Sequence, residues 1–142
     1  MNVEITRIHP AAQVPRYETT GAAGFDLTCV EDVTVLPSRV AMVRTGLVVK
    51  VPQGMFLAVF ARSSTPLKRG LLVANGVGVI DPDYCGETDE VKILVTNFTD
   101  TPVVVRAGDR IAQGIVLAAP RVTWTEGTPS SQSRGGFGST EG

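Results

Sequence analysis

Short runs rich in β-branched residues recur along the chain and are separated by turn-forming residues. β-branched side chains pack well on a pleated surface, and the Gly, Pro, Asn and Asp residues between the runs are typical of tight turns. The pattern predicts strands over residues 3–8, 25–30, 40–51, 55–61, 79–80, 91–97, 103–106, 110–117 and 121–125. Because short, regularly spaced strands must hide their edges in a barrel or a sandwich, the predicted fold class is all-β.

The chain has 142 residues, which suffices for one domain with a hydrophobic core and is too short for two of ordinary size. From residue 127 the composition shifts to Gly, Ser, Thr, Pro and Gln, and Phe137 is the only large apolar side chain. Such a stretch buries too little apolar surface to order itself. We therefore expect a β-barrel domain over residues 1–126 and a flexible segment over residues 127–142.

Helix signals coincide at one place, just after Arg62. Ser64 or Thr65 would cap a helix, Pro66 suits its first position and Gly70 suits its end, so one helical turn is predicted. The unpaired N–H groups at its start would bind phosphate oxygens beside the Arg62 guanidinium. The alternative interpretation is a capped structural turn with an exposed arginine.

Charge and composition exclude several classes of function. The 13 basic and 14 acidic side chains are interleaved and leave a formal net charge of −1, so no basic stripe is expected for nucleic acid or an anionic membrane. Cys29 and Cys85 lie far apart, which predicts reduced thiols and a cytoplasmic protein. His9 is the only histidine, which argues against a serine or cysteine triad. The spacing of His9 and the two cysteines matches neither structural zinc sites nor the pattern of the zinc deaminases.

Residues 75–87 combine features of a ligand site. Gly76 lets main-chain groups approach a bound molecule, and Asn75 adds an amide, so a predicted hairpin here offers the donors and acceptors that bind a nucleobase edge. Asp81 precedes Pro82, which favours an extended backbone and fixes the carboxylate at a strand end. Such a carboxylate can act as a general base. The alternative is an Asp-Pro-Asp turn between two strands.

Two further polar residues lie in predicted strands. Asp26 alternates with Phe25 and Leu27 and therefore faces away from them, toward solvent or a ligand. Gln113 is predicted to share an apolar face with Ile111. Its amide then needs a partner from a ligand or another subunit, because burying it unpaired costs about 1–3 kcal/mol.

Five segments resemble, in order, the five motifs of the trimeric dUTP diphosphatases (dUTPases). They are Ala-Gly-Phe-Asp-Leu at 23–27, Arg-Ser-Ser at 62–64, Gly-Val-Ile-Asp-Pro-Asp-Tyr at 78–84, Gly-Asp-Arg-Ile-Ala-Gln-Gly-Ile at 108–115 and Arg-Gly-Gly-Phe-Gly-Ser-Thr at 134–140. The resemblance implies a distorted jelly-roll-like β-barrel that assembles as a homotrimer with sites between subunits. It also implies Mg²⁺-assisted hydrolysis of dUTP to dUMP and pyrophosphate, which keeps uracil out of DNA and supplies dUMP for thymidylate synthesis.

By this resemblance Asp81 is the general base, Ser63 polarises the α–β bridge and Gln113 holds the α-phosphate. Asp26 orients the water shell of a Mg²⁺ that the triphosphate itself holds, and Tyr84 excludes a ribose 2′-OH. The implied substrate-binding residues are Arg62, Ser63, Ser64, Asn75, Gly76, Val79, Ile80, Asp81, Tyr84, Gln113, Arg134, Gly136, Phe137 and Gly138. Residues 127–142 would form a mobile lid in which Phe137 covers the uracil and Arg134 grips the terminal phosphate.

The chain departs from the family pattern at several places. The acidic residues 87–90 lengthen the connection after Tyr84 and are expected to bulge it, Cys85 replaces a basic or amide residue, and Gly114 replaces a bulkier one. Gln132 stands where the family's arginine commonly lies, so Arg134 is expected to take that role. Two alternatives share parts of the pattern, namely a dCTP deaminase or its bifunctional relative and a non-catalytic β-sandwich assembly module. The glycine-rich lid and Tyr84 favour a dUTPase.

Overall fold

The structure, a computed structural model, describes residues 1–138, and within them it is almost entirely β. Its strands are β1 (Glu4–Arg7), β2 (Phe25–Thr28), β3 (Val33–Val35), β4 (Val40–Arg44), β5 (Leu47–Lys50), β6 (Met55–Ala61), β7 (Leu71–Val73), β8 (Gly78–Ile80), β9 (Lys92–Asn97), β10 (Val103–Val105) and β11 (Arg110–Ala118). The helix α1 (Ser64–Arg69) follows the Arg-Ser-Ser sequence. The all-β prediction and the predicted helical turn are confirmed, and the arrangement fits a distorted jelly roll.

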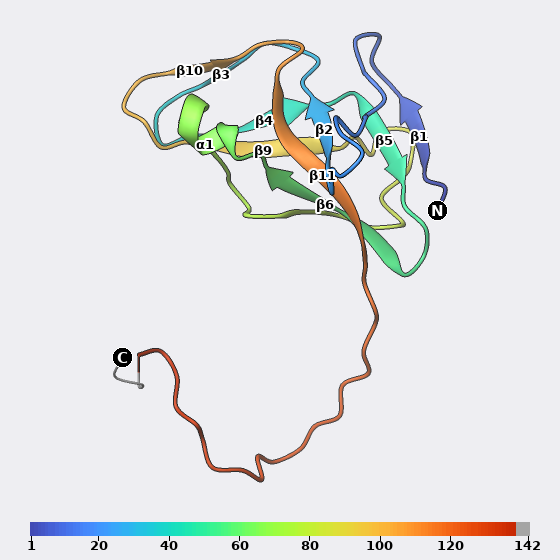
Figure 1. Cartoon of the computed structure of the whole chain (residues 1–142), viewed down its shortest axis with the longest axis vertical. Helices are drawn as coiled ribbons and strands as arrows, with labels where there is room; N and C mark the ends of the chain where they lie inside the picture. Colours follow the sequence, from blue (N-terminus) through green and yellow to red (C-terminus); the bar gives the residue numbers. More distant parts are fainter. Residues whose placement is uncertain (139–142) are drawn as a thin grey trace.

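Two antiparallel sheets carry the core (Figure 1). One has the strand order β2-β11-β6-β8 and the other the order β4-β9-β7, while β1 pairs with β5 and β3 pairs with β10. Strands that are distant in sequence therefore lie side by side, as β2 and β11 do. Consequently, both halves of the chain contribute to one core.

The inner faces of both sheets form this core. Leu27 of β2 and Leu57 of β6 are fully buried, as is Val95 of β9 from the opposite sheet. Burying one such side chain stabilises the fold by about 1.5–3 kcal/mol. The core also contains the polar Asn97, whose Nδ2 donates to the carbonyl of Val35 at 2.9 Å, so its burial is compensated.

Gly114 of β11 allows a close approach inside this core. It pairs with Phe25 of β2, and a Cβ at position 114 would lie 2.5 Å from Phe25 Cε2 and 2.9 Å from Leu57 Cδ1. Real Cβ atoms do not approach other atoms so closely, and the atoms that this Cβ would meet belong to packed side chains. The glycine is therefore explained by the Phe25 ring that lies across it.

The strand predictions succeeded to different extents. β6 has the predicted bounds, but the predicted strand 40–51 is wrong, because the chain turns at Thr45 and Gly46, where Gly46 has a φ of 66°. β3 and β7 were not predicted, and each has only three residues. The predicted strand 121–125 is also wrong, because no strand of the described residues pairs with it.

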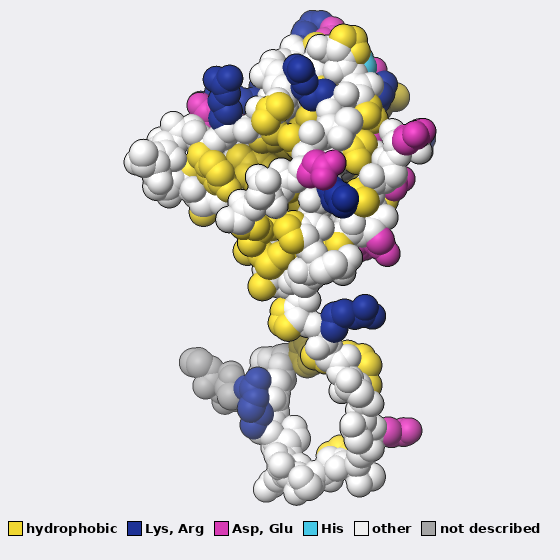
Figure 2. Space-filling view, turned by 90° about the vertical axis from the view of Figure 1, so that its right-hand side faces the viewer, with side chains coloured by type: hydrophobic (Ala, Val, Ile, Leu, Met, Phe, Trp, Pro, Cys, Tyr) yellow, Lys and Arg dark blue, Asp and Glu magenta, His cyan; other side chains and the backbone are white. Residues whose placement is uncertain are grey.

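After β11 the chain leaves the barrel as an extended segment (Figures 1 and 2). Residues 120–138 are all exposed and form neither helix nor strand, and the Trp124 side chain is 89% exposed. Within the described part of the chain, no helix is long and apolar enough to cross a membrane.

Candidate active site

Asn75 and Gly76 lie in the connection between β7 and β8, which we call the β7–β8 corner (residues 74–77). The predicted hairpin is not present here, because β7 pairs with β9 and β8 pairs with β6, so the two strands belong to different sheets. The Gly76 amide donates to the Val73 carbonyl at 3.0 Å, and Gly76 has a φ of 72°, which favours glycine. β7 and β8 are both edge strands, so each leaves a row of main-chain donors and acceptors available to a ligand.

Asp81 lies at the end of β8, as predicted. Ile80 is buried and Asp81 is exposed, and the Tyr84 amide donates to the Asp81 carbonyl at 3.1 Å, which closes the turn. The carboxylate borders a surface hollow of about 520 Å³ that Phe56 and Arg121 also line. Asp81 is therefore accessible to a ligand, and its role as general base stays a prediction.

Residues 86–90 do not bulge as expected. They form a compact turn in which the Gly86 amide donates to Asp89 Oδ2 at 2.8 Å, and the Glu90 side chain beyond it is buried. The Tyr84 hydroxyl donates to the Glu90 carbonyl at 3.2 Å. The longer connection is thus folded back onto the barrel. The sequence did not predict a buried Glu90, because acidic residues in a run such as 87–90 are usually exposed to solvent.

Asp26, Arg62 and Arg110 form what we call the charged cluster. Arg62 Nε lies 2.9 Å from Asp26 Oδ1, and Arg110 Nη1 lies 3.1 Å from Asp26 Oδ2. Arg62 Nη1 also donates to the Arg110 carbonyl at 3.0 Å. Leu27 packs in the core, whereas the Asp26 side chain, 11% exposed, faces two guanidinium groups, so the two residues lie on different faces as predicted.

The start of α1 is anchored differently from the prediction. The N-cap residue is Ser63, without a side-chain cap, rather than Ser64 or Thr65, and Pro66 lies inside the helix instead of at its first position. The buried Thr65 hydroxyl instead accepts from the Arg62 amide at 3.1 Å and donates to the Ile111 carbonyl at 2.6 Å. Gly70 ends the helix in a left-handed conformation, as predicted.

Gln113 lies on the same side of the sheet as Asp26. A register shift between Arg110 and Ala112 places Gln113 directly opposite Asp26, so the prediction that it shares a face with Ile111 is wrong. Its Nε2 donates to the Ala61 carbonyl at 3.1 Å, which supplies one of the partners that the amide needs. The β-bulge, invisible in a strict alternation of residues, thus brings Gln113 to the charged cluster.

The charged cluster and Asp81 lie at opposite ends of β6. Ile80 pairs with Leu57 near the start of β6, whereas Gln113 pairs with Phe60 near its end, next to Arg62. Ala61 lies five positions after Phe56, and at about 3.3 Å per residue this corresponds to roughly 17 Å along the strand. One chain therefore does not bring Asp81 together with Arg62, Ser63, Ser64 and Gln113.

The predicted lid residues Arg134, Gly136, Phe137 and Gly138 are all exposed in the segment that leaves the barrel. The structure does not bring them to the β7–β8 corner or to the charged cluster (Figure 1). Residues 139–142, which include the last two residues of the fifth motif and end the predicted lid, lie outside the described residues.

The side chains present fit an indirect metal role. Within residues 1–138, no group of three or more His, Cys, Asp or Glu residues could hold a metal ion. Asp26 Oδ2 is buried and makes no hydrogen bond, since Arg110 Nη1 lies near it without hydrogen-bond geometry. An oxygen in this state can accept a hydrogen bond from a metal-bound water.

Asp109 connects α1 to the turn that precedes β11. Arg69 Nη1 donates to Asp109 Oδ2 at 2.6 Å, and this hydrogen bond holds the pKa of the Asp109 carboxyl below its ordinary value of 3.8. The ion pair fixes the end of α1 against the strand that carries Gln113.

Comparisons with known proteins agree with this arrangement. The sequence model of the dUTPase family matches residues 11–141. A deoxyuridine 5′-triphosphate nucleotidohydrolase of Helicobacter pylori (strain P12) is 39% identical over 143 residues, which cover 99% of this chain and 97% of that one. The crystal structure of a dUTPase from Streptococcus mutans is 31% identical, with a TM-score of 0.77, and the match covers 87% of this chain and all of that one.

A mutant dUTPase of Staphylococcus bacteriophage 80alpha, solved with dUpNHpp, shares the fold with a TM-score of 0.80 at 22% identity, and the match covers 97% of each chain. The family match and the curated relative both extend over nearly the whole chain. The chain therefore belongs to the dUTPase family of hydrolases.

Proposed function

We propose that the chain hydrolyses dUTP to dUMP and pyrophosphate, with Asp81 as the general base. In this reaction Asp81 takes a proton from a water whose oxygen attacks the α-phosphorus, while the bond from that phosphorus to the α–β bridging oxygen breaks. The observation that carries the proposal is the match of the family over residues 11–141, which contain this exposed carboxylate at the end of β8.

The β7–β8 corner suits the base and sugar. The Asn75 amide and the unpaired main-chain groups of two edge strands offer donors and acceptors for the uracil edge, in a zone that includes Gly76, Val79 and Ile80. The Tyr84 ring, 39% exposed beside Asp81, would lie against the deoxyribose and leave no room for a ribose 2′-OH.

The charged cluster suits the phosphates. Arg62 carries a guanidinium beside exposed Ser63, and Gln113 lies opposite Asp26 on the same face, so the α- and β-phosphate oxygens would find several donors there. Ser63 would polarise the α–β bridge, since its hydroxyl is not used as a helix cap. A Mg²⁺ ion bound to the triphosphate would neutralise charge on the leaving pyrophosphate, and Asp26 Oδ2 would accept a hydrogen bond from its water shell.

Because Asp81 and the charged cluster lie far apart along β6, we infer that each site takes these groups from two copies of the chain, in a homotrimer. An apolar outer face supports assembly, since Val40 and Met42 of β4 and Leu72 of β7 lie on one side of their sheet and are exposed. Exposed apolar faces of this kind typically mark interfaces. The segment after β11 would then extend to a neighbouring copy, where Arg134 and Phe137 close the site as a lid (residues 127–142) beyond the barrel domain (residues 1–126).

We place this activity in the cytoplasm, where it would keep uracil out of DNA and supply dUMP for thymidylate synthesis. Cys29 and Cys85 are both free thiols, which fits a reducing compartment.

Pyrophosphate release from dUTP, with and without EDTA, tests the proposal. We expect release that EDTA suppresses and Mg²⁺ restores, and light scattering is expected to give the mass of three chains. Ammonia release from dCTP would instead indicate the deaminase alternative. A stable trimer that releases neither product would indicate a non-catalytic assembly module.

A further inference from the structure

Tyr84 is held both by its main chain and by the hydroxyl at the end of its side chain. Its amide donates to the Asp81 carbonyl at 3.1 Å, and its hydroxyl donates to the Glu90 carbonyl at 3.2 Å. The main-chain bond fixes the residue next to Asp81, while the hydroxyl bond fixes the direction of the ring. The orientation of the ring therefore depends on where the backbone at Glu90 lies.

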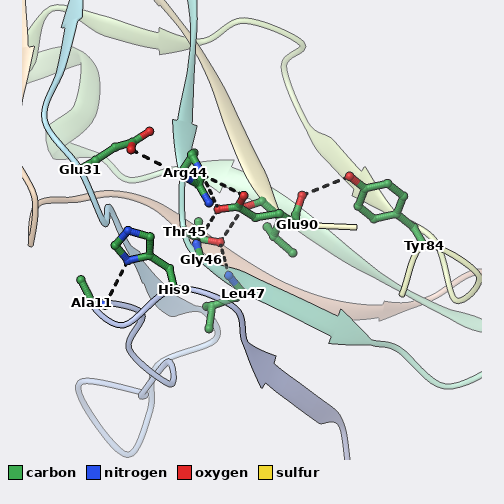
Figure 3. A network of polar contacts seen from close by, with 10 residues as sticks. His9, Ala11, Glu31, Arg44, Thr45, Gly46, Leu47, Tyr84 and Glu90 are labelled. Carbon is green, nitrogen blue, oxygen red and sulfur yellow. Dashed lines mark hydrogen bonds and ion pairs between the residues drawn. The ribbon is translucent and has the colours of Figure 1, made fainter. Parts of the chain in front are cut away.

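The Glu90 carboxylate fixes that backbone from inside the barrel (Figure 3). The Glu90 side chain is only 4% exposed, and its Oε1 and Oε2 accept from Arg44 Nε at 3.2 and 3.0 Å. Oε1 also accepts from the Gly46 amide at 2.7 Å. A buried carboxylate needs such partners, because an unpaired charge is costly in the interior.

The neighbouring main chain adds further bonds. The Val91 amide donates to the Leu47 carbonyl at 2.8 Å, and Thr45 Oγ1 donates to the Val91 carbonyl at 2.5 Å. Glu90 is thus the point where the connection after Tyr84 is tied to the turn between β4 and β5. Thr45, Glu90 and Val91 are all buried, so we expect any effect of theirs on a ligand to pass through the exposed Tyr84.

We propose that Glu90 is a positioning residue, which sets the orientation of the Tyr84 ring through the bond between the Tyr84 hydroxyl and the Glu90 carbonyl and thereby tunes discrimination between deoxyribose and ribose. The inference rests on the proposed function for its sugar-selecting role. The acidic connection of residues 86–90 then acts as a brace for Tyr84. Base recognition, which uses the β7–β8 corner, does not depend on this brace.

The test compares Glu90→Gln with Glu87→Gln in the full-length protein. The amide introduced by Glu90→Gln would keep an acceptor for the Gly46 N–H but lose the ion pair with Arg44, whereas Glu87 is exposed and has no side-chain hydrogen bond in the described structure. We expect Glu90→Gln to lower the ratio of kcat/KM for dUTP to kcat/KM for UTP about three- to tenfold. A change of this size corresponds to the free energy that one hydrogen bond typically contributes. The ratio for dUTP to dCTP should stay unchanged, and Glu87→Gln should leave both ratios unchanged.

A second substitution keeps the test decisive if Glu90→Gln folds poorly. Tyr84→Phe removes the same hydrogen bond and leaves the ion pair of Glu90 with Arg44 in place, so it should reproduce the change in sugar discrimination. The double variant should then show little further change, because both substitutions act on one bond. Additive effects of the two substitutions, or an unchanged sugar ratio in Tyr84→Phe, would overturn the proposal.

A measurement without turnover separates this inference from the proposed function. The chain has only two tyrosines, so 3-fluorotyrosine labelling gives two fluorine resonances, from Tyr17 and Tyr84. Glu90→Gln should shift or broaden the Tyr84 resonance and leave that of Tyr17 in place. A Tyr84 resonance identical to that of the unmodified chain would overturn the positioning role, whether or not the protein hydrolyses dUTP.

Discussion

The charged cluster and the β7–β8 corner hold their functional side chains in opposite ways. In the charged cluster, Asp26 and Arg62 already contact each other at 2.9 Å, and Gln113 beside them donates to a main-chain carbonyl. The side chains of Asn75 and Asp81 are exposed, and within residues 1–138 neither makes a hydrogen bond. One region is therefore fixed before a ligand arrives, and the other keeps its bonding capacity for the ligand.

This difference separates what a residue contributes to stability from what it contributes to function. Side chains fixed by other side chains preorganise the charge that a phosphate meets, and they also stabilise the fold. Exposed side chains without partners contribute little to stability, so they can be chosen for chemistry alone. Substitutions in the charged cluster should therefore change both stability and activity, whereas those at Asp81 should change activity alone.

Asp81→Asn gives the largest expected effect. Loss of a general base should lower kcat by roughly 10²–10⁴ while dUTP still binds and the thermal midpoint stays the same. Steady-state kinetics, isothermal titration of dUTP and calorimetry measure the three quantities. Asp83→Asn, in the same turn and also exposed, serves as the matched control. An unchanged kcat in Asp81→Asn would remove Asp81 from the mechanism.

Deletion of residues 130–142 should lower kcat/KM about a hundredfold, a typical cost when reacting groups are misplaced by about an ångström. The thermal midpoint should stay nearly constant, since the described part of this segment is fully exposed. Arg134→Ala should reproduce most of the loss, and Gln132→Ala should do little. The reverse outcome would assign the phosphate contact to Gln132, and full activity of the truncated chain would show that the segment is no lid.

Arg62→Ala tests the charged cluster. It removes the 2.9 Å contact to Asp26 and the bond to the Arg110 carbonyl, so the free energy of unfolding should fall by about 1–3 kcal/mol, along with activity. Urea denaturation measures the change. The control is Arg106→Ala, because the Arg106–Asp32 pair is exposed and contributes little to stability. Equal free energies of unfolding for the two variants would show that the Arg62 contacts stabilise the fold no more than an exposed ion pair does.

The smallest effect is expected from acid. The Arg69 hydrogen bond lowers the pKa of Asp109 in the folded chain, so it stabilises the fold above the unfolded value of 3.8, and this stabilisation is lost as the pH falls through the lower folded pKa. Asp109→Asn should therefore lower the thermal midpoint at neutral pH and change it less below pH 3.8. Thermal unfolding followed by circular dichroism across this range is the measurement. A constant difference at every pH would argue against the Asp109 ion pair.

Local patterns predicted those parts of the fold that depend on neighbouring residues. A continuous apolar run between the turn residues 52–54 and Arg62 predicted the bounds of β6, and Gly70 marked the end of α1 because a left-handed residue is required there. The predicted strand 40–51 failed for a non-local reason. The Gly46 amide, where the strand is interrupted, donates a hydrogen bond to the side chain of Glu90, 44 positions away. Residues 121–125 have the alternation of a strand, but alternation does not supply a partner strand.

The candidate site shows the same division. Asp81 was found at a strand end because Pro82 restricts the residue before it. The face of Gln113 was not predictable, because a β-bulge shifts the alternation without a clear sign in the sequence. The parts played by Thr65 and Arg110 depend on contacts with residues 46 and 84 positions away, respectively, which no local signal contains.

Asp81 and Arg62 lie at opposite ends of β6. In the proposed trimer, two variant chains that each lack one of these residues can therefore form an active site together. A chain with Asp81→Asn still supplies Arg62 to its neighbour, and a chain with Arg62→Ala still supplies Asp81. Mixed trimers then contain at least one site made entirely of intact residues, so the two alleles complement. An allele with both substitutions on one chain supplies neither group, and its product reduces the activity of intact copies with which it assembles.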